Sequence, residues 1–251
     1  MIKEKRIKKI HDYVIKQKSA SLDDLVSVFD VSKNTIRRDI QTLVERGDLK
    51  KVYGGVSVIH KKLECIQDRK ARNQNQKASI VEKASSYVDD GDVVFIDSGT
   101  TTIEMIEYIK DKSLTIFTNS IEFIIRALPF TNLTVISTGG LLDRKTDSFG
   151  SPLYIDLLSN YNIKKAFMAS TGISLSNGVT NASPLESELK KAIVKRSSEV
   201  FLLVDHDKFD KYGLMTYCNL DEIDYLVTDK SPNTTYREYA KKNSIRLVIS
   251  K

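Results

Sequence analysis

The chain contains few of the residues that disulfide, zinc and redox chemistry depend on. Its 251 residues include two Cys, three His and no Trp. Cys65 and Cys218 are far apart and form no CxxC pair, so neither a disulfide framework nor a structural metal site is expected. We expect both thiols to be reduced, as they are in cytoplasmic proteins.

Long apolar runs are also missing. No stretch approaches the roughly 18 consecutive apolar residues of a membrane-spanning helix. The N-terminus, MIKEKRIKKIHDYVIK, is charged throughout, so it does not have the pattern of a secretory signal. Hydrophobic residues make up 41% of the chain and charged residues 29%, which suits a protein with a substantial core. We therefore expect a cytoplasmic protein with no membrane partner, built as one large domain or as a small and a medium one.

The net charge of +6 is unevenly distributed along the chain. Residues 1–60 hold 13 Lys and Arg against 8 Asp and Glu, and residues 61–78 hold 6 against 2. Residues 79–251 hold 20 basic against 23 acidic residues. A basic head on a mildly acidic body is typical of a polyanion-binding module attached to another domain, although a solvated charged face gives the same pattern.

Residues 31–46, VSKNTIRRDIQTLVER, predict an amphipathic helix. Ser32 is a good N-cap, and an apolar stripe recurs at helical spacing through Ile36, Ile40, Leu43 and Val44. The other faces carry polar side chains that can reach phosphates and base edges in a major groove: Lys33, Asn34, Thr35, Arg37 and Arg38. Taken alone, the helix could equally be an ordinary one with a solvated charged face.

The neighbouring segments favour a DNA-binding helix. A short helix capped by Ser21, Leu22–Phe29, precedes it across a tight turn, as in a helix-turn-helix. An earlier helix, Arg6–Lys18, has one apolar face formed by Ile7, Ile10, Val14 and Ile15. Gly47 follows the predicted recognition helix as a C′ glycine. Residues 49–56 then predict a basic two-stranded wing that turns at or near Gly54-Gly55 and carries Lys50, Lys51 and Tyr53.

The stretch VSKNTIRRDIQTLVERGDLKKVYGG resembles the DeoR family of bacterial repressors, whose pattern is VS-x-x-TIRRDL-x-x-L-x-x-x-G-x-L-x-R-x-HGG. Ile40, Lys51 and Tyr53 depart from it, and none of these changes removes a positive charge. The resemblance implies a winged helix-turn-helix over residues 1–56 that docks on operator DNA. It also implies that the polar linker expected at 57–75 is partly helical.

From residue 76 onward, short apolar runs alternate with helical stretches, which predicts an α/β domain with a mainly parallel sheet. The predicted strands are Val93–Asp97, Leu114–Thr118, Leu133–Thr138, Lys165–Ser170, Glu199–Asp205, Tyr225–Thr228 and Arg246–Ile249. The predicted helices are Ile80–Val88, Thr101–Lys110, Ile121–Leu128, Leu153–Ser159, Pro184–Ser198 and Thr235–Asn243.

Ligands of such sheets bind beyond the carboxyl ends of the strands. Five polar turns follow predicted strands there: Asp97–Thr102, Thr118–Ser120, Gly139-Gly140, Ser170–Ser174 and Asp205–Phe209. In the first, we expect free N–H groups and outward-facing hydroxyls at a helix N-terminus, which is a ready anion site. A plain N-cap cluster is the alternative. Glu186 and Lys190, four apart on a helix, either pair with each other or face the cleft.

These turns also match, in order, the elements of the DeoR C-terminal sensor domain, with Asp207 where the family has Ser or Thr. The resemblance implies a fold related to ribose-5-phosphate isomerase and a phosphorylated sugar or sugar-alcohol effector. The predicted effector-binding residues are Asp97, Ser98, Gly99, Thr100, Thr101, Thr102, Asn119, Gly139, Gly140, Gly172, Glu186, Lys190 and Lys208.

An isomerase needs a general base, which that enzyme family supplies from a DGADE-type acidic loop and a KGGG-type loop. This chain has Ser170–Ser174 and Asn181–Leu185 there, without a carboxylate or a lysine. We therefore expect binding without turnover, with no catalytic residue, cofactor or metal.

The sequence thus predicts a DeoR-type repressor of carbohydrate metabolism genes that acts as a homo-oligomer, dimer or tetramer, because one short recognition helix reads few bases. Whether the effector releases or strengthens DNA binding stays open. The alternatives are an isomerase-like enzyme with a DNA-binding head and a ligand-independent chromosome-binding protein.

Overall fold

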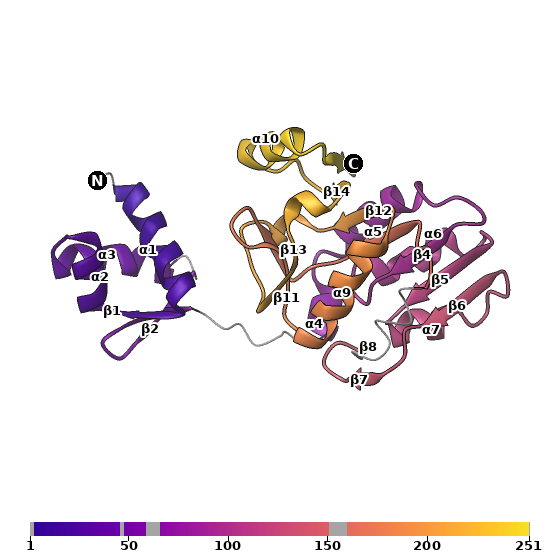
Figure 1. The fold of residues 1–251 in the computed structure, drawn as a ribbon, viewed down its shortest axis with the longest axis horizontal. Coiled ribbons are helices and arrows are strands. Elements are labelled where there is room, and N and C mark those ends of the chain that lie inside the picture. Colours follow the sequence, from indigo (N-terminus) through magenta and orange to yellow (C-terminus); the bar gives the residue numbers. More distant parts are fainter. Residues whose placement is uncertain (1–2, 46–47, 59–65, 151–159, 251) are drawn as a thin grey trace. The chain divides into compact units, whose positions relative to one another are not determined.

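The computed structural model describes residues 3–45, 48–58, 66–150 and 160–250. The chain folds into two compact units, residues 1–62 and 63–251 (Figure 1). The predicted linker at 57–75 contains helix α4 (Ile66–Ala71) and the start of α5 (Gln74–Ser85), so its expected helical character is confirmed. The predicted helix at 153–159 and the predicted C′ Gly47 lie outside the described residues.

The first unit is a three-helix head with a small sheet. Its elements are α1 (Lys3–Gln17), β1 (Ser19–Ser21), α2 (Leu22–Phe29), α3 (Lys33–Glu45), β2 (Leu49–Val52) and β3 (Gly55–Val58). The two predicted strands of the wing are present as β2 and β3. The prediction missed a third strand: β1 pairs with β3, which makes a three-stranded antiparallel sheet in the order β1-β3-β2. The turn of the wing lies at Tyr53-Gly54, near Gly54-Gly55 as predicted.

Local chemistry fixes the helix boundaries of this unit. Ser21 and Asp24 form a capping box at the start of α2, and Asp30 ends that helix in the left-handed conformation. The Ser32 hydroxyl accepts the N–H of Thr35 at 3.3 Å, as predicted for the N-cap of α3. The core contains both predicted apolar stripes, with Ile10, Val14 and Ile36 fully buried.

The second unit is built on a seven-stranded parallel sheet in the order β15-β14-β12-β9-β4-β5-β6. All seven predicted strands are present, as β4 (Val93–Ile96), β5 (Leu114–Thr118), β6 (Leu133–Ser137), β9 (Lys165–Met168), β12 (Glu199–Leu203), β14 (Tyr225–Thr228) and β15 (Arg246–Ile249). From β4 the chain adds β5 and β6 on one side, then returns to place β9 on the other. The sheet therefore has a topological switch point between β4 and β9.

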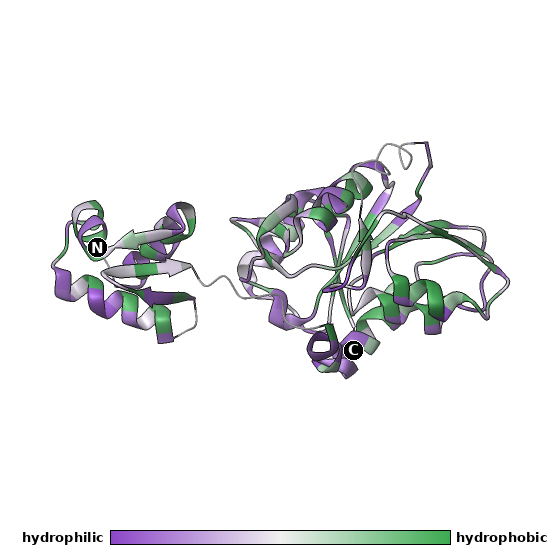
Figure 2. Ribbon diagram, turned by 90° about the horizontal axis from the view of Figure 1, so that it is seen from below, coloured by the Kyte–Doolittle hydropathy of each residue, from purple (hydrophilic) through white to green (hydrophobic). Residues whose placement is uncertain are grey.

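Successive side chains of the strands enter two different cores. Val94 and Ile96 pack with α5, the 3₁₀ helix η1 (Thr102–Met105), α6 (Ile106–Ile109) and α7 (Ile121–Ala127). Phe95 points to the opposite face, which α9 (Pro184–Arg196) and α10 (Thr234–Lys242) cover. Hydrophobic and hydrophilic bands follow one another along the helices, as expected of amphipathic helices (Figure 2).

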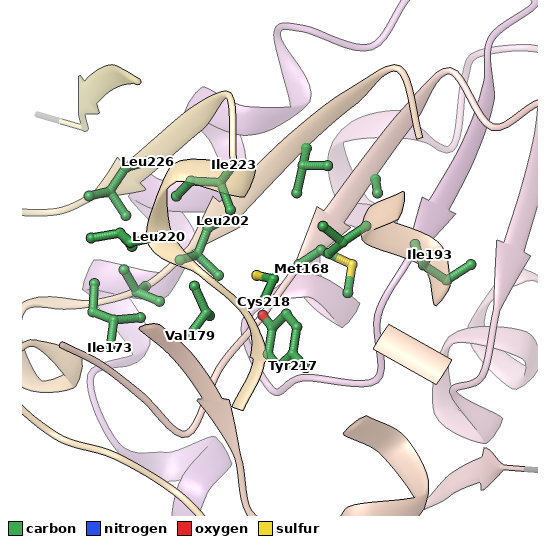
Figure 3. Close-up of a cluster of buried hydrophobic side chains, with 14 of the residues drawn as sticks. Met168, Ile173, Val179, Ile193, Leu202, Tyr217, Cys218, Leu220, Ile223 and Leu226 are labelled. Carbon is green, nitrogen blue, oxygen red and sulfur yellow. The ribbon is translucent and has the colours of Figure 1, made fainter. Parts of the chain in front are cut away.

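Short antiparallel pieces complete the second unit, and the sequence did not predict them. They are the hairpin β7 (Leu141–Asp143) with β8 (Ser148–Gly150), and the sheet formed by β10 (Gly172–Ser174), β11 (Gly178–Asn181) and β13 (Met215–Cys218). Tyr217 and Cys218 of β13 lie in the core together with Met168 of β9 and Ile193 of α9 (Figure 3). The helix predicted at 101–110 is instead η1 followed by a single α-helical turn, α6.

Candidate functional site

The predicted DNA-contacting residues lie on the exposed side of α3 and on the wing. Thr35 is half-buried; the others are exposed: Ser32, Lys33, Asn34, Arg37, Arg38, Lys50, Lys51 and Tyr53. Lys33 pairs with Asp23 of α2 at 2.7 Å, in an exposed bridge that contributes little to stability. A groove of about 600 Å³ is lined by residues of α3 and of the wing, among them Arg37, Arg38 and Lys51. The head thus presents a cationic surface with exposed amide and hydroxyl groups.

One residue of the TIRRD segment has a structural role that the sequence did not reveal. Asp39 is buried, and its carboxylate accepts two hydrogen bonds from the Arg6 guanidinium, at 2.6 and 3.3 Å. This bidentate pair joins α1 to α3. It sets the position of the exposed face of α3 relative to the rest of the head.

In the second unit, the turn after β4 lies at the switch point of the sheet. Asp97 follows β4 directly, and its N–H donates to the carbonyl of Phe167 on β9 at 3.1 Å. A Cβ on Gly99 would lie 2.2 Å from the Ala169 Cβ, so the close approach of the two strand ends requires glycine. The backbone N–H groups of residues 98–101 make no hydrogen bond to another described residue. They form a group of available donors for an anion.

The prediction of outward-facing hydroxyls is wrong at Ser98, which is buried and donates to Glu186, and at Thr102. The Thr102 hydroxyl does not face outward but donates to the carbonyls of Asp97 and Gly99, at 2.6 and 3.0 Å. A hydroxyl at the start of a helix can satisfy nearby backbone groups in this way. Thr102 therefore stabilises the turn. Thr100, half-buried, and Thr101, buried, complete the turn.

A buried carboxylate connects this turn to three other segments. Glu186, in the first turn of α9, accepts hydrogen bonds from Ser98 at 3.2 Å, Ser148 at 2.6 Å and Asn181 at 2.7 Å. Asn119 donates to the same Ser98 hydroxyl at 3.2 Å. Although burial acts to raise it, the pKa of Glu186 lies below its ordinary value because of the Lys190 ammonium and these hydrogen bonds.

Lys190 and Glu186 do not form the ion pair that their spacing allows. The Lys190 ammonium instead lies 2.7 Å from the Asp97 carboxylate and donates to the Ala169 carbonyl at 2.9 Å. Burial raises the pKa of Asp97, and the Lys190 charge opposes this rise. Both predicted residues thus belong to the buried framework of the site.

Several buried oxygen atoms at the carboxyl edge of the sheet have no hydrogen-bond partner among the described residues. They are Asp97 Oδ1, Asn119 Oδ1, Thr138 Oγ1 and Ser170 Oγ, which follow β4, β5, β6 and β9 respectively. Buried polar atoms in proteins are nearly always hydrogen-bonded. A row of four such oxygens along neighbouring strands is therefore suited to a ligand that carries several hydroxyl groups.

Cations gather at the β12 end of the same edge. Lys208 lies in the 3₁₀ turn η2 (His206–Lys208), and its ammonium makes no ion pair with a described residue. Burial and the charges of Lys211, Arg72 and Arg69 lower the pKa of Lys208. Burial, Lys208 and Arg69 likewise lower the pKa of Lys77 to about 8. Such mutual repulsion is relieved when an anion binds.

Two of these cations, Arg69 and Arg72, lie in the stretch that the sequence assigned to a linker, and Lys77 lies just after it. Arg69 and Arg72 belong to α4 and the residues just after it, and Lys77 is in α5. The Arg69 Nε is buried and has no hydrogen-bond partner among the residues that the structure describes, while the Lys77 ammonium donates to the Arg69 carbonyl. Only the basic composition of QDRKARNQNQK could have indicated their role.

The remaining predicted residues lie in the surrounding turns. Gly139 and Gly140 follow β6 with φ values of 63° and 105°, so the turn itself requires glycine. Gly172 opens β10 and is buried. The Asp229 carboxylate accepts a hydrogen bond from the backbone N–H of His206 at 2.7 Å, and its other oxygen lies 2.7 Å from the His206 Nδ1. These contacts fix the turn that carries Lys208.

Among the described residues, no group of three or more His, Cys, Asp or Glu side chains could hold a metal ion. None of the described helices is both long enough and apolar enough to cross a membrane.

Both units match protein-family models. Residues 6–62 match the DeoR-like helix-turn-helix domain, and residues 72–230 match the DeoR C terminal sensor domain. Together the two models cover most of the chain.

Relatives match along nearly the whole length. The HTH-type transcriptional regulator IolR of Bacillus subtilis is 42% identical over 247 residues, which is 98% of each chain. The HTH-type transcriptional repressor GlcR of the same organism is 27% identical over 252 residues, covering 100% of this chain and 97% of that protein. A solved ribose 5-phosphate isomerase A from Methanocaldococcus jannaschii is 16% identical over 55% of each chain, with a TM-score of 0.40. The two family models and the full-length relatives lead to one conclusion: the chain belongs to the DeoR family of helix-turn-helix transcriptional regulators.

Proposed function

We propose that the protein is a transcriptional repressor of carbohydrate metabolism genes, controlled by a phosphorylated sugar or sugar alcohol. The observation that carries the proposal is the pairing of two kinds of groups at one sheet edge. Lys77 and Lys208 provide cations at the β12 end of this edge, and residues 98–101 provide N–H groups that bond to no other described residue. Asp97, Asn119 and Thr138 provide buried oxygens that have no hydrogen-bond partner in the described part of the chain.

The two ends of this site suit two parts of one small molecule. Backbone N–H groups and ammonium groups bind the phosphate oxygens. The Asp97 and Asn119 oxygens accept hydrogen bonds from hydroxyl groups, which a polyol supplies on successive carbons. We assign the effector contacts to Asp97, Ser98, Gly99, Thr100, Thr101, Asn119 and Lys208, with Lys77 and Arg69 added. Thr102, Gly172, Glu186 and Lys190 hold these groups in place.

The DNA-binding role of the head follows from α3 and the wing. Arg37 and Arg38 are exposed on α3 and make no ion pair with a described residue, so both are available to the major groove or to phosphates. Lys50, Lys51 and Tyr53 on the wing contact the flanking backbone. A homo-oligomer places two heads on a repeated half-site, which supplies the affinity that one short helix lacks.

We also propose that the protein binds its effector without converting it to another compound. The segment Ser170–Ser174 that follows β9 has no carboxylate to act as a general base. Asp97 and Glu186, the carboxylates nearest to the turn after β4, are buried and engaged by Lys190, Ser148 and Asn181. The relatives named as transcriptional regulators support the same reading.

A thermal-shift titration of the full chain tests the effector assignment. Each sugar phosphate of a panel is compared with its unphosphorylated sugar, and Lys208→Ala is the site control. We expect at least one phosphorylated compound to raise the melting temperature of the wild type, with little effect on Lys208→Ala. If no phosphorylated compound stabilises the wild type, or if Lys208→Ala responds equally, the assignment fails. Conversion of any stabilising compound to its isomer would contradict binding without turnover.

A further inference from the structure

Asn73 lies at the break between α4 and α5 in an unusual backbone conformation. Its φ is 54° and its ψ is 39°, in the left-handed region that few residues other than Gly adopt, although Asn tolerates it better than most. Its Nδ2 donates to Oδ2 of Asp207 at 2.9 Å, across 134 positions of sequence. The bond joins the α4–α5 junction to the turn η2.

Cations lie next to both ends of this hydrogen bond. Lys77, one helical turn after Asn73, donates its N–H to the Asn73 carbonyl at 2.9 Å. The ammonium of Lys77 reaches back to the carbonyl of Arg69, so the junction carries both cations. On the other side, Lys208 is the immediate neighbour of Asp207. The Asn73–Asp207 bond therefore joins two segments whose cations, Arg69 and Lys77 on one and Lys208 on the other, repel each other, while Asp205 attracts both lysines.

We propose that Asn73 is a positioning residue for the anion site, because its hydrogen bond to Asp207 holds Arg69 and Lys77 beside Lys208. The inference rests on the proposed function in one respect, that this site takes a phosphate group. Asp207 stands where the DeoR pattern has Ser or Thr. A carboxylate accepts a stronger, charge-assisted hydrogen bond than a hydroxyl does, which suits it to oppose the repulsion.

Two variants with the net charge of the wild type isolate the contribution of the bond. Asn73→Gly removes the side chain while keeping a residue that adopts the left-handed conformation freely. The double variant Asn73→Asp with Asp207→Asn reverses the bond, so that the amide at 207 donates to the carboxylate at 73. Asn75→Gly places the same glycine substitution at an exposed position two residues further on, as the control for local flexibility.

The probe is inorganic phosphate, titrated into the full chain at constant ionic strength against chloride, with the dissociation constant taken from the thermal shift. We expect Asn73→Gly to weaken phosphate binding about tenfold, as the loss of one hydrogen bond to a charged group does. The reversed pair should bind within about threefold of the wild type, since its bond is restored. Asn75→Gly should bind like the wild type.

The outcomes separate this inference from the proposed function. If the wild type binds phosphate and Lys208→Ala does not, but Asn73→Gly binds as tightly as Asn75→Gly, the positioning role is wrong and the anion site stands. If Asn73→Gly and the reversed pair are equally weak, the hydrogen bond is not the cause and the inference also fails. If the wild type does not bind phosphate, both the anion site and the positioning role are overturned.

Discussion

The Nζ of Lys190 lies 2.7 Å from Oδ2 of Asp97, and both side chains are almost completely buried. The same carboxylate oxygen accepts the N–H of Ala169 at 2.9 Å, and Lys190 also donates to the Ala169 carbonyl. One ion pair thus joins α9 to the ends of β4 and β9. It leaves Oδ1 of Asp97 without a partner among the described residues, at the switch point of the sheet.

Lys190→Met should destabilise the sensor unit strongly. The variant keeps the length of the side chain but leaves the Asp97 carboxylate buried without its cation, a change that costs about 3–5 kcal/mol. Urea unfolding of the full chain measures the loss. Lys191→Met, at the exposed neighbouring position, is the control and should change the free energy of unfolding by less than about 0.5 kcal/mol. Equal losses in the two variants would mean that the buried pair has no special role.

Arg37→Ala and Arg38→Ala should each weaken DNA binding. A contact with a guanine edge is worth roughly 1–3 kcal/mol, and a phosphate contact mainly changes the salt dependence. Fluorescence anisotropy with a DNA fragment flanking the gene, at two salt concentrations, distinguishes these cases. Lys242→Ala on α10 removes one exposed positive charge from the other unit and should have no effect. Unchanged affinity in both arginine variants would remove α3 from the DNA interface.

Thr101→Asp should abolish the effector response and leave DNA binding intact. The substitution places a carboxylate in the turn whose N–H groups are proposed to bind the phosphate, so like charges repel. Thr134→Asp puts the same carboxylate on an exposed strand position and is the matched control. Effector titrations of both protein–DNA complexes give the result. A normal response from Thr101→Asp would locate the phosphate elsewhere.

The affinity for a phosphorylated effector should fall as the pH rises above neutrality. Burial and the neighbouring Lys208 charge lower the pKa of Lys77 to about 8, so its ammonium is lost as the pH passes that value. A phosphate monoester, with a second pKa of about 6, is already doubly charged at pH 7. The affinity should therefore drop about tenfold between pH 7 and pH 9. Calorimetric titration at several pH values measures this drop. Lys77→Met should bind weakly and without the same pH dependence, and an unchanged profile in that variant would exclude Lys77 as the cause.

The strands of the large sheet were predictable because parallel strands buried on both faces form continuous apolar runs. The short antiparallel strands were not, since a three-residue strand such as β7 or β10 leaves no periodic signal. The recognition helix was predictable from Ser32 and the stripe through Ile36 and Ile40. The pairing of Ser19–Ser21 with β3 was not, because it depends on tertiary contact between distant segments.

The polar side chains of the site were predictable by position, but their partners were not. Asp97 and Asn119 follow apolar runs, which puts them at the carboxyl edge. The spacing of Glu186 and Lys190 allowed either a local pair or a role in the cleft, and each is in fact bound by residues distant in sequence. Lys77 was missed because the surrounding polar segment lacks apolar periodicity, and its burial arises only when α5 packs on the sheet.

The most direct test uses a labelled DNA fragment flanking the gene, bound by the full chain at fixed salt and followed by fluorescence anisotropy. A panel of sugar phosphates, each beside its unphosphorylated sugar, is then added to the complex. We expect one phosphorylated compound to change the anisotropy selectively, and Lys208→Ala to bind the same DNA without this response. Tight DNA binding that ignores every compound of the panel would contradict control by a sugar phosphate and would favour a ligand-independent DNA-binding protein.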